Sequence, residues 1–121
     1  MRIRGWFYGA AVYNVAWGTL FVLAPVDATR GLGAATHDPV AWRVVGMFVL
    51  VYAPAYWWSA RAPERHRDLI AIATLGKVLG PLGFGWAAAT GVLPLRFGLT
   101  IVTNDLIWLP AFGRYLALSR P

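Results

Sequence analysis

Three long stretches without a charged side chain constrain this fold more than any other feature. Residues 5–26, 44–60 and 78–95 contain no Asp, Glu, Lys or Arg. A helix needs about 20 predominantly apolar residues to cross the roughly 30 Å hydrocarbon core of a bilayer. A water-soluble chain of 121 residues would instead bury one modest core beneath a charged surface. Only 13% of the residues are charged, against about 25% in ordinary soluble domains, so we predict an integral membrane protein.

The apolar stretches group into four predicted crossings, at about residues 5–23, 41–60, 69–90 and 95–118. Each is close to the length that a membrane-spanning helix requires. Consecutive crossings must run in opposite directions, because each connection stays on one side of the bilayer. We therefore predict an all-α fold, a polytopic antiparallel bundle of four transmembrane helices, built as one domain over residues 1–121.

The first crossing has an alternative interpretation as a cleaved signal peptide. The tripeptide Val26-Asp27-Ala28 loosely fits a small-residue cleavage site. The apolar stretch before it is longer than the usual signal-peptide core of about 7–15 residues, which favours a helix that is retained.

The distribution of Lys and Arg predicts the orientation of the bundle. Positive charges are enriched on the cytoplasmic side of membrane proteins. The two termini and the 61–68 connection together carry seven Lys and Arg residues, and the opposite side carries three. This excess predicts that both termini lie in the cytoplasm and that the chain is a multi-pass protein of the inner cell membrane. The seven are Arg2, Arg4, Arg61, Arg65, Arg67, Arg114 and Arg120, and the three are Arg30, Arg43 and Arg96.

The bulk charge and the cysteine count exclude several classes of function. The net charge of +6 does not predict nucleic-acid binding, because the cations flank apolar spans instead of clustering on a water-facing surface. The absence of cysteine excludes disulfides and Cys-ligated metals. His37 and His66 fall in predicted loops on opposite sides of the membrane, so we expect no metal site. No motif identifies a cofactor.

Lys77 and Asp105 are the only full charges well inside the predicted spans. At about 1.5 Å of rise per residue, Lys77 lies roughly 12 Å from the cytoplasmic end of its span and Asp105 roughly 18–20 Å from the corresponding end of its own. A lone charge at the centre of a span costs about 2.5–3.5 kcal/mol on the insertion scale. We therefore expect the two side chains to pair inside the bundle, either as a structural ion pair or as a functional site, since ionisable residues within a membrane mark functional candidates.

Further polar and aromatic residues lie at depths or on helix faces that bring them toward this pair. Trp108 follows Asp105 by three residues, which places both on one face of an α-helix. Phe84 lies two turns beyond Lys77 on its face. The predicted site therefore has Asp105 and Lys77 as candidate catalytic residues and the following candidate ligand-binding residues: Asn14, Tyr52, Phe84, Asn104 and Trp108.

Gly76, Gly80 and Pro81 make an unusual local run around Lys77. Glycines four residues apart predict a helix face that another helix can approach closely. Pro81 removes the hydrogen bond from its own nitrogen to the Lys77 carbonyl, which predicts either a polar pocket or only a kinked, tightly packed helix.

Two segments of the chain resemble a known group of proteins. The sequences GKVLGPLGF at 76–84 and FGLTIVTNDLIWLP at 97–110 resemble motifs of small bacterial four-helix membrane proteins of the DoxX-like type. The resemblance implies a four-helix membrane fold over most of the chain. Some DoxX-type proteins work with quinone-linked redox partners, but no role of an individual residue follows from that. The chain also resembles small multidrug transporters in length, although their first helix carries an essential Glu where this one has only Asn14.

Three functional hypotheses follow from these observations. The first is a bundle whose polar pocket either only binds, or binds and acts on, a membrane-dissolved lipophilic molecule such as a quinone, an isoprenoid or a polyketide. The second is an accessory subunit whose glycine face receives a helix of a membrane-protein partner. The third is a small proton-coupled transporter that works as a dimer, a homo-oligomer being required because four helices leave little room for a path through one chain.

Overall fold

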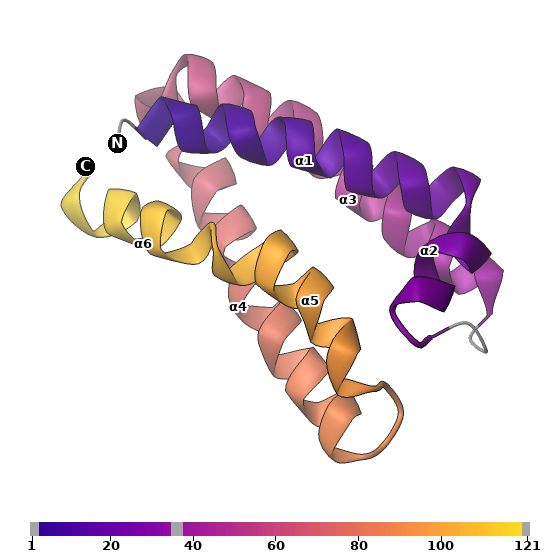
Figure 1. Ribbon diagram of the computed structural model, residues 1–121. Coiled ribbons are helices and arrows are strands. Elements are labelled where there is room, and N and C mark those ends of the chain that lie inside the picture. Colours follow the sequence, from indigo (N-terminus) through magenta and orange to yellow (C-terminus); the bar gives the residue numbers. More distant parts are fainter. Residues whose placement is uncertain (1–2, 35–37, 120–121) are drawn as a thin grey trace.

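The computed structural model describes residues 3–34 and 38–119, and every regular element in these two ranges is a helix (Figure 1). The three long helices are α1 (Ile3–Leu23), α3 (Pro39–Arg61) and α4 (Arg67–Ala89), with 21, 23 and 23 residues. At about 1.5 Å per residue they are roughly 31–35 Å long. Each is long and apolar enough to cross a membrane. The all-helical prediction is confirmed, whereas Arg2, His37 and Arg120 lie outside the described residues.

The segment predicted as the fourth crossing is helical but is not one continuous helix. It consists of the 3₁₀ turn η2 (Leu95–Phe97), the short helix α5 (Gly98–Ile101), the π-helical turn η3 (Val102–Leu106) and helix α6 (Leu109–Leu118). Pro110 gives a physical reason for the interruption, because its ring nitrogen donates no hydrogen bond and its ring collides with the preceding turn of an α-helix.

Helices α1 and α3 form a closely packed antiparallel hairpin and lie side by side along their length (Figure 1). Two glycines allow this approach. A Cβ atom on Gly18 would lie 2.8 Å from the carbonyl oxygen of Gly46, and a Cβ atom on Gly46 would lie 2.9 Å from the carbonyl oxygen of Gly18. Small residues that let two backbones meet are typical of helix packing in membranes. Here backbone meets backbone, whereas on the predicted Gly76–Gly80 face a Cβ atom on Gly80 would meet the side chain of Asp105 and one on Gly76 would meet nothing within 4 Å.

The second hairpin is formed by α4 and the segment from η2 to α6, and it diverges from the first hairpin (Figure 1). Arg67, at the start of α4, ties this end of α4 to the end of α6. Its guanidinium donates hydrogen bonds of 2.9 Å to the hydroxyl of Ser119 and of 2.9 Å to the carbonyl of Leu116. These bonds satisfy polar groups at the end of α6, where a helix leaves its last carbonyls without partners.

The two hairpins share a buried core near the end of the molecule where α1 begins and α6 ends. Phe7, Tyr56, Ile70 and Phe112 contribute to it from α1, α3, α4 and α6. The ring centroids of Phe7 and Phe112 lie 4.8 Å apart, and those of Tyr56 and Phe112 lie 5.6 Å apart. All four helical segments therefore meet at this end, next to the predicted site.

Two short helices form the remaining connections. Helix α2 (Pro25–Gly31) lies between α1 and α3, and the 3₁₀ turn η1 (Pro63–Arg65) lies between α3 and α4. Pro54 and Pro81 both lie inside helices that continue past them.

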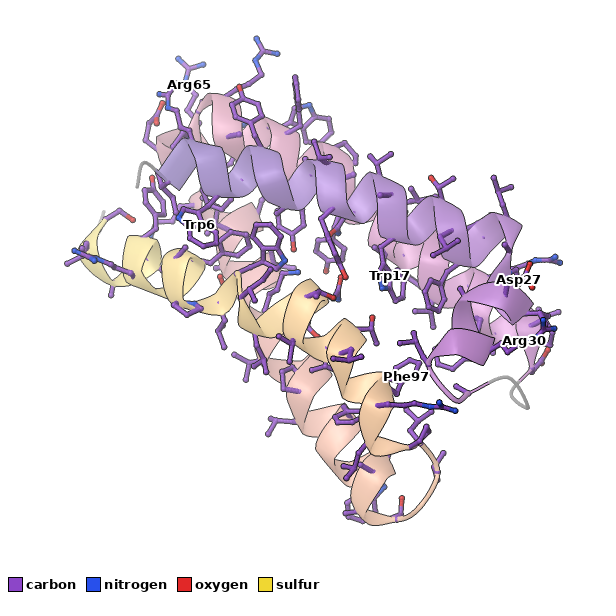
Figure 2. The ribbon with its side chains drawn as sticks, in the orientation of Figure 1. Trp6, Trp17, Asp27, Arg30, Arg65 and Phe97 are labelled. Carbon is purple, nitrogen blue, oxygen red and sulfur yellow. The ribbon has the colours of Figure 1, made fainter. Side chains whose placement is uncertain are left out.

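The outer surface of the long helices is apolar. Leu23, Phe48 and Trp86 are 74%, 66% and 75% exposed, and they are three of many large hydrophobic side chains on the surface. A soluble protein rarely exposes such extended apolar patches. Figure 2 shows Arg65 at one end of the molecule and Asp27 with Arg30 at the opposite end. This distribution is the one that lipid around the middle and water at both ends would favour.

Candidate functional site: a buried ion pair beside a polar pocket

Lys77 of α4 and Asp105 of η3 form a buried ion pair. The ammonium Nζ lies 3.9 Å from Oδ1 of the carboxylate, and the two side chains are only 4% and 7% exposed. The pairing predicted from their depths is therefore confirmed. The other ion pair found among the described residues, Arg30 with Asp27, is largely exposed at 3.7 Å. Water screens that surface pair, while the buried pair depends on its protein neighbours for stabilisation.

The π-helical turn supplies one of those neighbours. The backbone N–H groups of Ile107 and Trp108 donate to the carbonyls of Val102 and Asp105, at 3.1 and 3.2 Å. In a regular α-helix they would instead bind the carbonyls of Thr103 and Asn104. Those two carbonyls accept hydrogen bonds from the Trp108 indole, at 2.7 Å, and from Nζ of Lys77. The irregular turn therefore provides an acceptor for the buried ammonium, and such π turns are frequent at functional sites.

Tyr56 and Gly80 complete the surroundings of the ion pair. The Tyr56 ring centroid lies 5.3 Å from Nζ of Lys77, within the range of a cation–π interaction. Gly80 lies directly against the carboxylate of Asp105, and a Cβ atom at this position would collide with that carboxylate. Sequence reasoning missed both roles. The signals were nevertheless present, because Gly80 follows Lys77 by three residues and Tyr56 follows Tyr52 by four, which places each on the expected helix face.

A pocket of about 240 Å³ lies beside the ion pair, between α1, α3, α4 and η3. It contains both charged residues and three of the five predicted ligand-binding residues. Its lining combines these polar groups with apolar side chains of α3 and small residues of α4. The lining residues are Asn14, Val45, Phe48, Val49, Tyr52, Tyr56, Ala73, Gly76, Lys77, Asn104 and Asp105.

The two asparagines of the pocket each have a buried oxygen without a partner. Nδ2 of Asn14 donates to the carbonyl of Val49 at 3.0 Å, and Nδ2 of Asn104 donates to Oδ1 of Asp105 at 3.1 Å. Within the described part of the chain, no group donates a hydrogen bond to Oδ1 of either side chain. A buried polar atom without a partner is uncommon and requires an explanation.

Phe84 and Trp108 lie outside this pocket. Trp108 packs edge-on against Trp6 at 5.7 Å between ring centroids. Phe84 packs against Phe97, at 6.3 Å between ring centroids, farther along α4. The prediction for Trp108 assumed α-helical spacing after Asp105, and the π turn together with the break that follows it changes that spacing. The sequence contains no direct signal for this turn.

Polar contacts also join the two hairpins beside the pocket. The hydroxyl of Tyr13 lies 2.7 Å from that of Thr103, and Nε1 of Trp17 donates a 2.7 Å hydrogen bond to the hydroxyl of Thr100. In Figure 2 the Trp17 side chain extends from α1 toward the second hairpin. These bonds connect α1 to α5 and η3, and they help to fix the position of the wall that carries Asp105.

Among the described residues, no group of three or more His, Cys, Asp and Glu side chains is arranged to hold a metal ion. Comparison of the chain with protein-family models, with curated proteins and with solved structures finds no match. The resemblance to DoxX-like proteins therefore stays a prediction.

Proposed function

We propose that this protein crosses the inner cell membrane four times, with both ends in the cytoplasm. The apolar surfaces of α1, α3 and α4 support this topology. The broken segment 95–118 contributes the fourth crossing, since it returns to the end of the molecule where α1 begins (Figure 1). The loops and helix ends on that side carry most of the arginines, as the positive-inside rule requires of a cytoplasmic face.

We propose that the pocket binds a lipophilic small molecule that is dissolved in the bilayer, of the quinone, isoprenoid or polyketide class. One observation carries this proposal, namely a 240 Å³ pocket that joins a buried ion pair to an apolar rim. Val45 and Phe48 belong to this rim and are 39% and 66% exposed, so the rim is within reach of lipid. Binding sites for small molecules typically combine apolar walls with a few well-placed polar groups.

The residues of the pocket have separate roles in this proposal. Asp105 orients the polar head of the ligand or exchanges a proton with it. Lys77 pairs with the buried carboxylate and offsets its charge. Phe48, Val49 and Tyr52 form the apolar wall, a role that Phe84 and Trp108 cannot fill from their positions outside the pocket.

Native mass spectrometry of the protein released from nanodiscs tests this proposal. We expect a bound lipophilic molecule on the wild-type protein and its loss from Asp105→Asn, with both proteins equally abundant in the membrane. Asp27→Asn is the matched control, because it makes the same chemical change at an exposed ion pair. If Asp105→Asn lowers abundance but the remaining protein still carries its ligand, the ion pair is architectural and the proposed function fails.

A role as an accessory subunit is a second candidate, and one observation favours it. Gly76 and Gly83 of α4 have open space where a Cβ atom would lie, so a partner helix has room to approach there. Small residues on an exposed membrane helix are typical of helix–helix contacts. Co-purification of a second polypeptide in mild detergent, and its loss from a Gly83→Leu variant, would support this alternative.

A further inference from the structure

A second hollow of the molecule is a groove between the first turns of α1 and helix α6. Its volume is about 630 Å³, and it shares no lining residue with the pocket beside the ion pair. The residues that line it include Ile3 and Trp6 of α1 and Pro110, Arg114 and Leu118 of α6. In Figure 2 the Trp6 side chain extends from α1 toward α6. The proposed function gives this α1–α6 groove no role.

The shape of the α1–α6 groove matches an acyl chain. Its residues 110, 114 and 118 are spaced by four, which places them on one face of α6. At about 1.5 Å per residue this face is roughly 12 Å long, close to the roughly 15 Å of hydrocarbon in one leaflet. Pro110 and Leu118 are exposed, so the groove is open to the lipid that would surround the protein.

Arg114 gives the groove a positive charge that is not neutralised by the protein. Among the described residues, its guanidinium takes part in neither an ion pair nor a hydrogen bond. Arg67, at the same end of the molecule, instead donates to the Ser119 hydroxyl and to the Leu116 carbonyl. Arg114 lies one turn before the last residue of α6, so its long side chain can reach the headgroup region while its stem stays along the groove. A free guanidinium binds a phosphate group well, often through two parallel N–H bonds.

The end of the molecule around the groove favours an anion. Of the described residues, five arginines and only two acids lie there, at the start of α1, around η1 and in α6. They are Arg4, Arg61, Arg65, Arg67 and Arg114, with Glu64 and Asp68. Neither acid lines the groove. This excess attracts a lipid of net negative charge more strongly than a zwitterionic lipid, whose ammonium group it repels.

We propose that the α1–α6 groove binds an anionic phospholipid, with an acyl chain between α1 and α6 and the phosphate on the guanidinium of Arg114. Basic pockets between membrane helices commonly bind lipid headgroups. Trp6 adds an aromatic side chain of the type that is enriched where membrane helices meet the headgroups. The site is separate from the pocket of the proposed function and requires only that the chain lies in a bilayer.

Native mass spectrometry of the full-length protein released from nanodiscs tests this proposal. The nanodiscs contain equal amounts of dioleoylphosphatidylglycerol and dioleoylphosphatidylcholine, which share their acyl chains and differ in the charge of the headgroup. Collisional activation removes weakly held lipid before the remaining lipid is counted. We expect wild-type protein to retain phosphatidylglycerol about fivefold more often than phosphatidylcholine, as one arginine near the membrane surface implies.

Two variants assign this preference to the groove. Arg114→Gln keeps a polar side chain and removes the charge, so we expect the retention of the two lipids to become nearly equal. Arg61→Gln is the matched control, because it makes the same change at an exposed arginine at the same end of the molecule, outside the groove. It should keep the wild-type preference.

Each other outcome overturns the proposal. Equal retention of the two lipids by wild-type protein would do so without any variant having to fold. A preference that survives in Arg114→Gln, or that falls equally in Arg61→Gln, would mean that the charge of the whole end attracts the lipid and that the groove does not. A wild-type dimer that retains neither lipid would mean that a second copy of the chain covers the groove. A ligand in the pocket beside the ion pair is recognised by its own mass, so the proposed function succeeds or fails independently.

Discussion

The two helical hairpins of this protein are held together in different ways. In the first hairpin, α1 and α3 are continuous helices that meet through Gly18 and Gly46, where each backbone lies against the other. In the second hairpin, α4 faces a segment that changes from helix α5 to the π turn η3 and then to helix α6. Its central contact is the ion pair between Lys77 and Asp105. Shape complementarity dominates the first hairpin, and polar contacts dominate the second.

This difference indicates where each kind of interaction is useful in a membrane. Lipid is as apolar as a leucine side chain, so helices gain little from the hydrophobic effect and associate through close packing or through polar contacts. Close packing leaves no room for a ligand. The polar hairpin contains an irregular turn whose released carbonyls bind other groups, and the pocket lies between this hairpin and the first one. The first hairpin therefore serves as a scaffold for the second.

Replacing Gly46 by leucine should have the largest effect on the stability of the protein. The new side chain would meet the carbonyl of Gly18 and the side chains of Phe21 and Val22, so the two helices could not close. We expect the loss to exceed about 5 kcal/mol, the lower end of the stability of native proteins, and hence no folded protein. Gly83→Leu on open α4 is the control and should fold. Size-exclusion chromatography in detergent measures both, and a monodisperse Gly46→Leu protein would contradict the scaffold role.

Breaking the ion pair should have the next largest effect. Lys77→Met leaves the carboxylate of Asp105 buried without its cation, and loss of one partner of a buried pair costs about 3–5 kcal/mol. The double variant Lys77→Met with Asp105→Leu removes both charges and should recover most of that loss. The free energy of unfolding in mixed detergent micelles provides the measurement. A double variant as unstable as the single one would mean that the pair itself stabilises the second hairpin.

The sequence predicted the elements that follow from composition and depth. Uncharged stretches identify the three long helices, and helical rise places Lys77 and Asp105 at similar depths, where the two side chains pair. Depth and helix face also predict Asn14, Tyr52 and Asn104 at the site, and all three line the pocket.

What could not be predicted depends on departures from regular geometry. The position of Trp108 was inferred from α-helical spacing, which the π turn at 102–106 alters. The close contact of Gly18 with Gly46 depends on how two helices cross, and neither glycine belongs to a closely spaced pair in the sequence. The sequence places Gly80 on the Lys77 face, but its contact with the carboxylate of Asp105 also depends on how α4 and η3 cross.

A methyl group at Gly80 should have an intermediate effect. The carboxylate of Asp105 is held by Lys77 and Asn104, so it cannot move away freely from a new Cβ atom. We expect Gly80→Ala to destabilise the protein by about 1–3 kcal/mol, the usual cost of overpacking. Gly76→Ala is the control on the same helix, and it should stabilise by about 0.4–1 kcal/mol because its Cβ atom meets open space. Equal stability of the two variants would show that the carboxylate adapts without loss.

Loss of the hydrogen bond between Trp17 and Thr100, which joins the two hairpins, should have the smallest effect on stability. Trp17→Phe keeps a ring that can stack on Phe21, whose centroid lies 3.8 Å from that of Trp17, and removes the donor to Thr100. Hydrogen bonds between membrane helices contribute about 0.6 kcal/mol on average, and up to about 2 kcal/mol in model peptides. A double-mutant cycle with Thr100→Val, measured in mixed micelles, should therefore give a coupling energy of about 0.5–1 kcal/mol. A coupling near zero would mean that the scaffold positions the wall carrying Asp105 by packing alone. A coupling in the expected range would instead mean that the hydrogen bond between Trp17 and Thr100 helps to hold the pocket in place, because the second hairpin lacks the close backbone contact that fixes the first.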